Sequence, residues 1–251
     1  VIRGYGASLD QETMGGGAWL ENSGVLSNCV IIGNSAVSGG GGLYGGALNN
    51  CTLVGNSVGW GYCSGGGALT STLNNCTLTG NSAFLGGGAA RCTLNYCTLS
   101  NNWVDHPLGG DSGGGGGGAS DCILNNCTVI NNHAGGGGGG TADGVLSNCT
   151  VVGNSAGVFG GGAEGGTLYN CTLSGNSAES GGGAVRSTLY NSILSGNTAT
   201  SEGGGVYAGT VYNCTLSGNT ANTEGGGAYG DEWNTCAVYN SIVYYNNAPS
   251  G

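Results

Sequence analysis

The sequence predicts an all-β protein, a single-stranded right-handed parallel β-helix (β-solenoid) of about ten turns. Three observations support this prediction: a repeat of 21–22 residues runs through the chain, its aliphatic residues alternate with polar ones, and Gly, Asn, Ser and Thr fill the intervals. These four residue types are poor helix formers. A coil this short cannot bury its own apolar face, so copies of it must stack.

The repeat is aligned on the central residue of a recurring Asn-Cys-Thr triplet, which is Cys in eight repeats and Ser in two. These anchor residues are Cys29, Cys51, Cys76, Cys97, Cys127, Cys149, Cys171, Ser192, Cys214 and Ser241. An Asn follows each anchor by five residues, at Asn34, Asn56, Asn81, Asn102, Asn132, Asn154, Asn176, Asn197, Asn219 and Asn246. Because stacking turns every repeat position into a ladder, we expect both sets to be structural ladders, with the thiols packed as small, weakly polar groups.

Two further positions of the repeat are informative about side-chain direction. Aliphatic residues three before and two after the anchor, such as Leu73 and Leu99, are expected to point inward. The Asn directly before most anchors, such as Asn75, is expected at a corner, because Asn tolerates positive φ and its amide can bond to the Asn above and below.

Longer intervals between anchors indicate inserted loops near residues 59–64, 103–112 and 229–236 of a β-helix spanning 15–251. Residues 1–14 are expected to form an N-terminal segment that caps the first coil only partly. A coil without a cap presents unpaired backbone groups. We therefore expect the partner to be a second copy stacked end to end, or neighbouring domains of a longer chain.

Composition narrows the classes of function. Lys and Arg total 3 against 13 Asp and Glu, for a net charge of −10, which disfavours a nucleic-acid partner. No apolar run is long enough to enter a membrane. Cysteines arrive one per turn rather than in Cys-x-x-Cys groups, so neither a metal nor a cofactor is expected. Carboxylates and bases are scarce and scattered, so the sequence predicts that the protein is not an enzyme.

Four features of the sequence are candidate sites. Cys92 and Cys122 share a repeat position in adjacent turns and form either a disulfide or two stacked thiols. A Tyr ladder two residues before four anchors is either a binding stripe or ordinary strand stabilisation. Thr residues directly after the anchors suggest, as a minor alternative, an ice-binding face. The inserted loop near residues 103–112 is a weaker candidate, for a sugar or metal site. The ladder consists of Tyr169, Tyr190, Tyr212 and Tyr239, and the insertion site of Trp103, Asp105, His106, Asp111 and His133.

The recurring Gly-Gly-Gly-Ala and Gly-Asn-Ser-Ala motifs resemble the repeats of bacterial surface β-helices. They are similar to the repeats of polymorphic outer-membrane proteins and of Gly/Asn-rich repeat proteins of environmental bacteria that carry a C-terminal anchor domain. The resemblance implies an extracellular or cell-surface location. The leading interpretation is a non-enzymatic structural or adhesive β-helix, either a head-to-tail filament subunit or a segment of a larger surface protein. Surface glycans are a further candidate partner. A carbohydrate-binding or polysaccharide-cleaving β-helix is the alternative.

Overall fold

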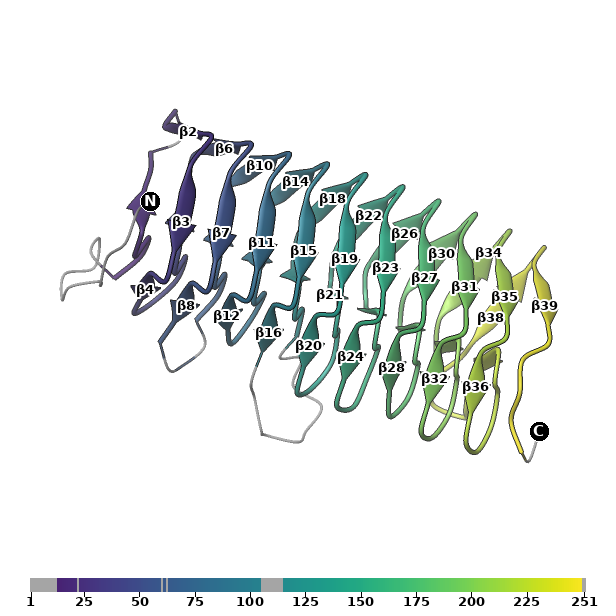
Figure 1. Ribbon diagram of the computed structural model, residues 1–251. Coiled ribbons are helices and arrows are strands. Elements are labelled where there is room, and N and C mark those ends of the chain that lie inside the picture. The colour runs from purple at the N-terminus through teal and green to yellow at the C-terminus, as the bar shows by residue number, and fades with distance from the viewer. Residues whose placement is uncertain (1–12, 22, 60, 62, 105–114, 250–251) are drawn as a thin grey trace.

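The computed structural model describes residues 13–21, 23–59, 61, 63–104 and 115–249, and it shows coils stacked in a row from the N-terminal to the C-terminal end (Figure 1). Each regular coil contributes four short strands, one to each of four parallel sheets, which we call sheets I to IV. Strand pairing is parallel and in register throughout, so equivalent residues of successive coils lie side by side. The fold predicted from the sequence is thereby confirmed.

Sheets I and II each contain ten strands. Sheet I is formed by β1 (Ala18–Trp19), β5 (Leu43–Tyr44), β9 (Ala68–Leu69), β13 (Ala89–Ala90), β17 (Ala119–Ser120), β21 (Thr141–Ala142), β25 (Ala163–Glu164), β29 (Ala184–Val185), β33 (Val206–Tyr207) and β37 (Ala228–Tyr229). Sheet II is formed by β2 (Val25–Ser27), β6 (Ala47–Asn49), β10 (Thr72–Asn74), β14 (Thr93–Asn95), β18 (Ile123–Asn125), β22 (Val145–Ser147), β26 (Thr167–Tyr169), β30 (Thr188–Tyr190), β34 (Thr210–Tyr212) and β38 (Ala237–Tyr239).

Sheet III has ten strands and sheet IV has nine. Sheet III is formed by β3 (Val30–Ile32), β7 (Thr52–Val54), β11 (Thr77–Thr79), β15 (Thr98–Ser100), β19 (Thr128–Ile130), β23 (Thr150–Val152), β27 (Thr172–Ser174), β31 (Ile193–Ser195), β35 (Thr215–Ser217) and β39 (Ile242–Tyr244). Sheet IV is formed by β4 (Ser35–Ala36), β8 (Ser57–Val58), β12 (Ser82–Ala83), β16 (Trp103–Val104), β20 (His133–Ala134), β24 (Ser155–Ala156), β28 (Ser177–Ala178), β32 (Thr198–Ala199) and β36 (Thr220–Ala221).

The core is a bundle of aliphatic ladders. The middle residue of each three-residue strand points inward, as the alternation of side chains along a strand requires. Leu73 of sheet II and Leu99 of sheet III are fully buried, as expected. At the tight Gly bend before sheet I, the backbone of one coil lies against the next. A Cβ on Gly88, for example, would come within 2.5 Å of the Gly118 carbonyl oxygen, so glycine is required there.

A second buried ladder is polar and consists of the Asn residues five positions after the anchors. Asn102 Nδ2 donates to Asn132 Oδ1 at 3.0 Å and to the Leu78 carbonyl at 2.9 Å. Its Oδ1 accepts from the backbone nitrogen and the Nδ2 of Asn81, at 3.0 and 2.9 Å. The same pattern repeats from coil to coil, so these buried amides hold adjacent coils in register.

The anchor Cys residues line the interior of the corner between sheets II and III. The Cys127 thiol donates to the Asn125 carbonyl at 3.3 Å and accepts the Cys97 backbone N–H at 3.3 Å. Ser192 makes the equivalent two bonds, with Tyr190 at 2.8 Å and Cys171 at 3.0 Å. The corner therefore requires a small side chain that both donates and accepts a hydrogen bond, which explains why either Cys or Ser is found at this position.

Cys92 and Cys122 form a shorter ladder of the same kind at the corner between sheets I and II. Both are buried free thiols, and Cys122 Sγ accepts the Cys92 backbone N–H at 3.3 Å. The disulfide alternative is thus not what the structure contains. In-register parallel neighbours keep their Cβ atoms about one strand spacing (~4.8 Å) apart, beyond the ~3.5–4.5 Å that a disulfide spans.

The insertion predicted at 103–112 begins later than expected. Trp103 belongs to β16 and pairs with Ser82 on one side and His133 on the other. It occupies a regular repeat position, which is why the strand continues through it. Asp105, His106 and Asp111 lie outside the described residues, as does most of the expected N-terminal cap.

None of the described residues forms a helix that could cross a membrane.

Candidate binding surfaces

One outward ladder of sheet II changes its chemistry along the rod. After Ser27, four successive coils place an amide here: Asn74 Nδ2 donates to Asn49 Oδ1 at 3.0 Å, and the same bond joins Asn95 to Asn74 and Asn125 to Asn95. After Ser147 the same position is Tyr. These four rings stack with centroids 4.9–5.1 Å apart and interplanar angles of 7–13°; they are Tyr169, Tyr190, Tyr212 and Tyr239.

The stacking of the Tyr rings limits what the ladder can bind. A ring in the middle, such as Tyr190, has both faces covered by its neighbours, so the ladder presents ring edges and a row of hydroxyl groups. The flanking rings Tyr169 and Tyr239 are 41% and 49% exposed. A ligand can therefore contact the row along its length but cannot insert between the rings.

Beside this ladder lies a row of exposed Asn side chains, which we call the corner asparagines. They occupy the turn between sheets II and III with φ of 48–55°, as expected for Asn at a corner. Their amides do not form the continuous ladder that the sequence suggested, because in the described part of the chain only Asn170 and Asn148 bond to each other, at 3.3 Å. The corner asparagines are Asn28, Asn50, Asn75, Asn126, Asn148, Asn170, Asn191, Asn213 and Asn240.

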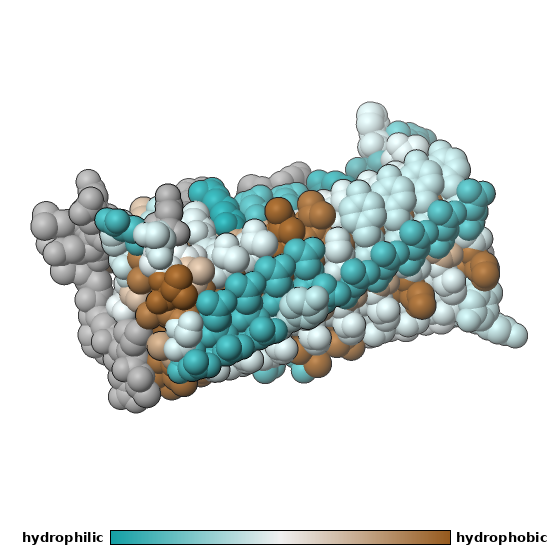
Figure 2. All heavy atoms as spheres, turned by 90° about the horizontal axis from the view of Figure 1, so that it is seen from above, coloured by the Kyte–Doolittle hydropathy of each residue, from teal (hydrophilic) through white to brown (hydrophobic). Residues whose placement is uncertain are grey.

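The charged side chains are segregated from this corner. No strand of sheet II or sheet III contains Asp, Glu, Lys, Arg or His. In the described residues, the charged groups lie along sheet IV, sheet I and the turns beside sheet I. Seen from above, the rod shows a continuous hydrophilic band with a row of large, weakly polar side chains next to it (Figure 2). We call the corner asparagines together with the Asn and Tyr ladder of sheet II the corner strip.

The charged side carries a cluster that links three successive coils. Arg186 Nη2 donates to Glu164 Oε1 at 3.2 Å, and its guanidinium lies 5.0 Å from the centre of the Phe159 ring. Burial raises the pKa of the Glu164 carboxyl, although the Arg186 charge opposes the shift. Burial, together with the negative charge of Asp121, also raises the pKa of Asp143. Partly buried carboxyls beside a guanidinium are groups that can exchange protons with a ligand.

The sequence analysis missed this cluster, because carboxylates and bases looked scarce and scattered along the chain. The available signal was spacing: Glu164 and Arg186 are separated by 22 residues, one coil. On a flexible chain that separation means nothing, but stacking places such residues next to each other.

The predicted insertion site is only partly defined. Trp103 is 44% exposed and lies next to His133, whose Nδ1 is 2.9 Å from Ser155 Oγ. These residues line the outer face of sheet IV and are brought together as predicted. In the described residues no three His, Cys, Asp or Glu side chains are grouped to hold a metal ion.

Comparison with known proteins identifies the class. The family model for the right-handed β-helix region matches residues 113–250, more than half of the chain. The chain therefore belongs to the right-handed β-helix family. A search of curated proteins gave no match. The family match concerns the β-helix itself and not the particular surface repeats or the anchor domain that the motifs resemble.

The solved structures to which this chain is similar are distant from it. One is a mannuronic acid specific polysaccharide family 6 lyase from human gut microbiota, at 10% identity and TM-score 0.29, covering 93% of this chain and 80% of that one. A tailspike protein of Escherichia coli bacteriophage HK620 has 11% identity and TM-score 0.26, covering 84% and 55%. The TibC-catalysed hyper-glycosylated TibA fragment has 20% identity and TM-score 0.19, covering 90% and 99%.

The expectation that this protein is not an enzyme is corrected by these findings. The finding that overturns it is the similarity to a polysaccharide lyase. The argument from scattered carboxylates also fails, because stacking brings Asp143, Glu164 and Arg186 into one cluster. Neither architecture nor composition therefore excludes catalysis.

Proposed function

We propose that this protein is an extracellular adhesive β-helix that binds an extended, uncharged polysaccharide along the corner strip. The observation that carries the proposal is the segregation of charge. A chain with net charge −10 keeps sheets II and III and the corner between them free of charged side chains, and presents amides and phenol hydroxyls there instead.

The spacing of the strip suits a polymer. Successive coils repeat amide and hydroxyl groups at about one strand spacing, ~4.8 Å. An extended glycan also repeats its hydroxyl groups along its length, so several weak hydrogen bonds can form at once. Because the backbone of the rod is rigid, little conformational entropy is lost when they form. Tyr adds contact area at low entropic cost.

The test is a co-sedimentation assay with insoluble neutral polysaccharides, such as cellulose and chitin, and with a charged gel as comparison. The key variant replaces Asn170, Asn191 and Asn213 with Asp, which keeps the left-handed corner conformation and the size but adds three charges. We expect at least tenfold weaker retention, because each carboxylate loses the amide donor and must be desolvated.

The matched control adds the same charge elsewhere, at three exposed positions of the sheet IV side: Ser177→Asp, Thr200→Asp and Asn222→Asp. These changes should leave retention unchanged. Equal losses in both variants would show that net charge alone matters, and absence of binding to every neutral polysaccharide would refute the proposal.

Two other expectations can be tested with the same material. Thr faces outward on sheet III in six consecutive coils, from Thr52 to Thr172, after which Ile193 interrupts the row. Thermal hysteresis measured with the wild-type chain would favour ice as the ligand of this face.

The second expectation concerns the partner. The coil containing β39 presents apolar side chains, with Ile242 62% and Val243 51% exposed. We propose that another coil of the same repeat covers them, and electron microscopy would show rods longer than one chain if a second copy does so.

A further inference from the structure

The first coil contains an insertion at the corner between sheets I and II. Five residues separate β1 from β2, whereas two separate β5 from β6 and two separate β9 from β10. The flanking strands keep the regular register, since Trp19 pairs with Tyr44 and Val25 with Ala47. Stacking alone therefore does not require the three extra residues.

The second coil is adapted to hold this insertion. Gly45 and Gly46 both have positive φ, and a side chain on either would collide with the insertion. A Cβ on Gly46 would lie 2.6 Å from the Gly24 carbonyl oxygen and 2.7 Å from Leu20 Cβ. The loop is closed by a hydrogen bond from the Gly24 N–H to the Glu21 carbonyl at 2.8 Å. The loop therefore packs closely against the glycine pair of the second coil, which fixes its position beside the corner.

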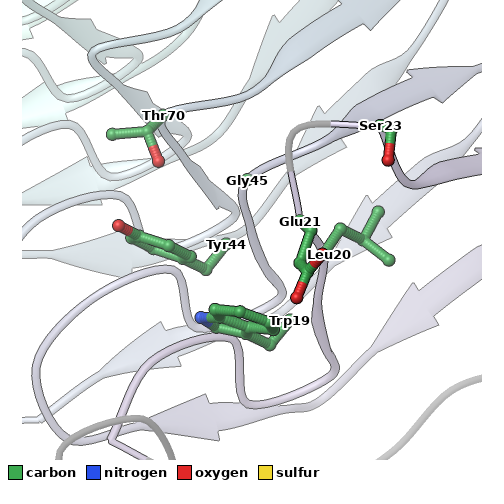
Figure 3. Close-up of a pocket in the computed structure, with 7 residues that line it drawn as sticks. All are labelled: Trp19, Leu20, Glu21, Ser23, Tyr44, Gly45 and Thr70. Carbon is green, nitrogen blue, oxygen red and sulfur yellow. The ribbon is translucent and has the colours of Figure 1, made fainter.

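The loop forms one wall of a shallow hollow of about 580 Å³ (Figure 3). The opposite wall is aromatic: the Trp19 and Tyr44 rings are parallel within 6°, with centroids 6.3 Å apart, and Trp19 is 43% exposed. The rim is polar and carries Glu21, Ser23 and Thr70. The hollow as a whole is lined by Trp19, Leu20, Glu21, Ser23, Tyr44, Gly45 and Thr70.

We propose that this hollow binds one sugar ring of a neutral glycan, as a site separate from the corner strip. An aromatic wall accepts the apolar face of a pyranose, and a carboxylate with nearby hydroxyls binds its hydroxyl groups. The Thr70 hydroxyl donates to the Leu69 carbonyl at 2.8 Å, so its oxygen faces the ligand as an acceptor. The Glu21 carboxylate disfavours acidic sugars by charge repulsion. The site lies at the other corner of the coil, and its ligand is a single ring rather than a polymer surface.

The test is saturation-transfer NMR, followed by titration, with a panel of methyl glycosides: neutral hexoses, an N-acetylhexosamine and a uronic acid. We expect at least one neutral glycoside to bind with a Kd on the order of 1 mM, and the uronic acid to bind at least tenfold more weakly. Trp19→Ala and Glu21→Gln should each weaken binding about tenfold. Glu21 is exposed, so the second variant does not disturb folding.

Trp233→Ala is the matched control, because Trp233 is 89% exposed but lies between β37 and β38, in the last coils of the rod. It should leave binding unchanged. The inference is wrong if no glycoside binds, if the uronic acid binds best, or if Trp233→Ala weakens binding as much as Trp19→Ala. Since the corner-strip variants do not touch the hollow, the two proposals fail separately. A wild-type protein that binds a neutral glycoside but is retained by no neutral polysaccharide would refute the proposed function and leave this site standing.

Discussion

Replacing Asn102 with Ala tests whether the buried amide ladder holds the coils together. Asn102 is fully buried, and its side chain takes part in four hydrogen bonds with Asn81, Asn132 and Leu78. Without it the Asn81 backbone N–H loses its acceptor in the interior, while Asn132 Oδ1 keeps the Asn102 backbone N–H at 2.9 Å. A buried N–H without an acceptor costs about 1–3 kcal/mol. The cavity left by the side chain and the lost hydrogen bond to the Leu78 carbonyl oxygen add to this cost. We expect a loss of about 3–5 kcal/mol in the free energy of unfolding.

The assay is urea unfolding followed by circular dichroism. The control is Asn125→Ala, because this Asn also belongs to an amide ladder but lies half-buried on the outer face, where it donates one bond to Asn95 at 3.0 Å. That substitution should cost about 1 kcal/mol. If the two variants lose similar stability, the buried ladder contributes no more than a surface one and the reasoning is refuted.

Three further predictions use the same unfolding assay. Leu99→Ala should cost about 2–5 kcal/mol, because it opens a cavity at a fully buried site; a change below about 1 kcal/mol would contradict the core assignment. Cys127→Ser should stay within about 1 kcal/mol of the wild type, since Ser192 makes both corner bonds in the same ladder, whereas Cys127→Ala should cost about 2 kcal/mol. Tyr96→Asn should stabilise the protein by about 1 kcal/mol, because Tyr96 has φ of 56° where Asn126 occupies the next coil; a destabilised variant would show that the exposed Tyr ring makes a compensating contact.

Stacking explains which site residues could be predicted. A ladder made of one repeat position in successive coils is visible in the sequence, so the Tyr ladder and the neighbouring pair Trp103 and His133 were found from spacing. A site made from different repeat positions leaves only an approximate spacing of one coil in the sequence, which does not distinguish it from unrelated pairs. Glu164 and Arg186 occupy neighbouring positions of successive coils, and only the path of the turn brings their side chains to 3.2 Å.

The hollow at Trp19 shows the same limit in another form. The extra residues of the first coil lie inside the predicted β-helix, but no anchor precedes Cys29, so no interval between anchors marks the excess. Gly45 and Gly46 were equally ambiguous, since 60 glycines occur in the chain. Their role depends on which backbone lies above them, and that is decided by the contact between coils.

The sequence by itself determined the repeat, the parallel stacking, the inward Leu ladders, the Asn ladder five residues after the anchors and the corner position of Asn. Each follows from local rules, namely the alternation of side chains along a strand and the tolerance of Asn for positive φ. Tertiary structure alone decided that a coil has four strands, that Cys92 and Cys122 stay unbridged, and that charge collects on one side of the rod. Those properties depend on distances between coils, and a linear spacing gives the neighbours of a residue but not the direction in which their side chains point.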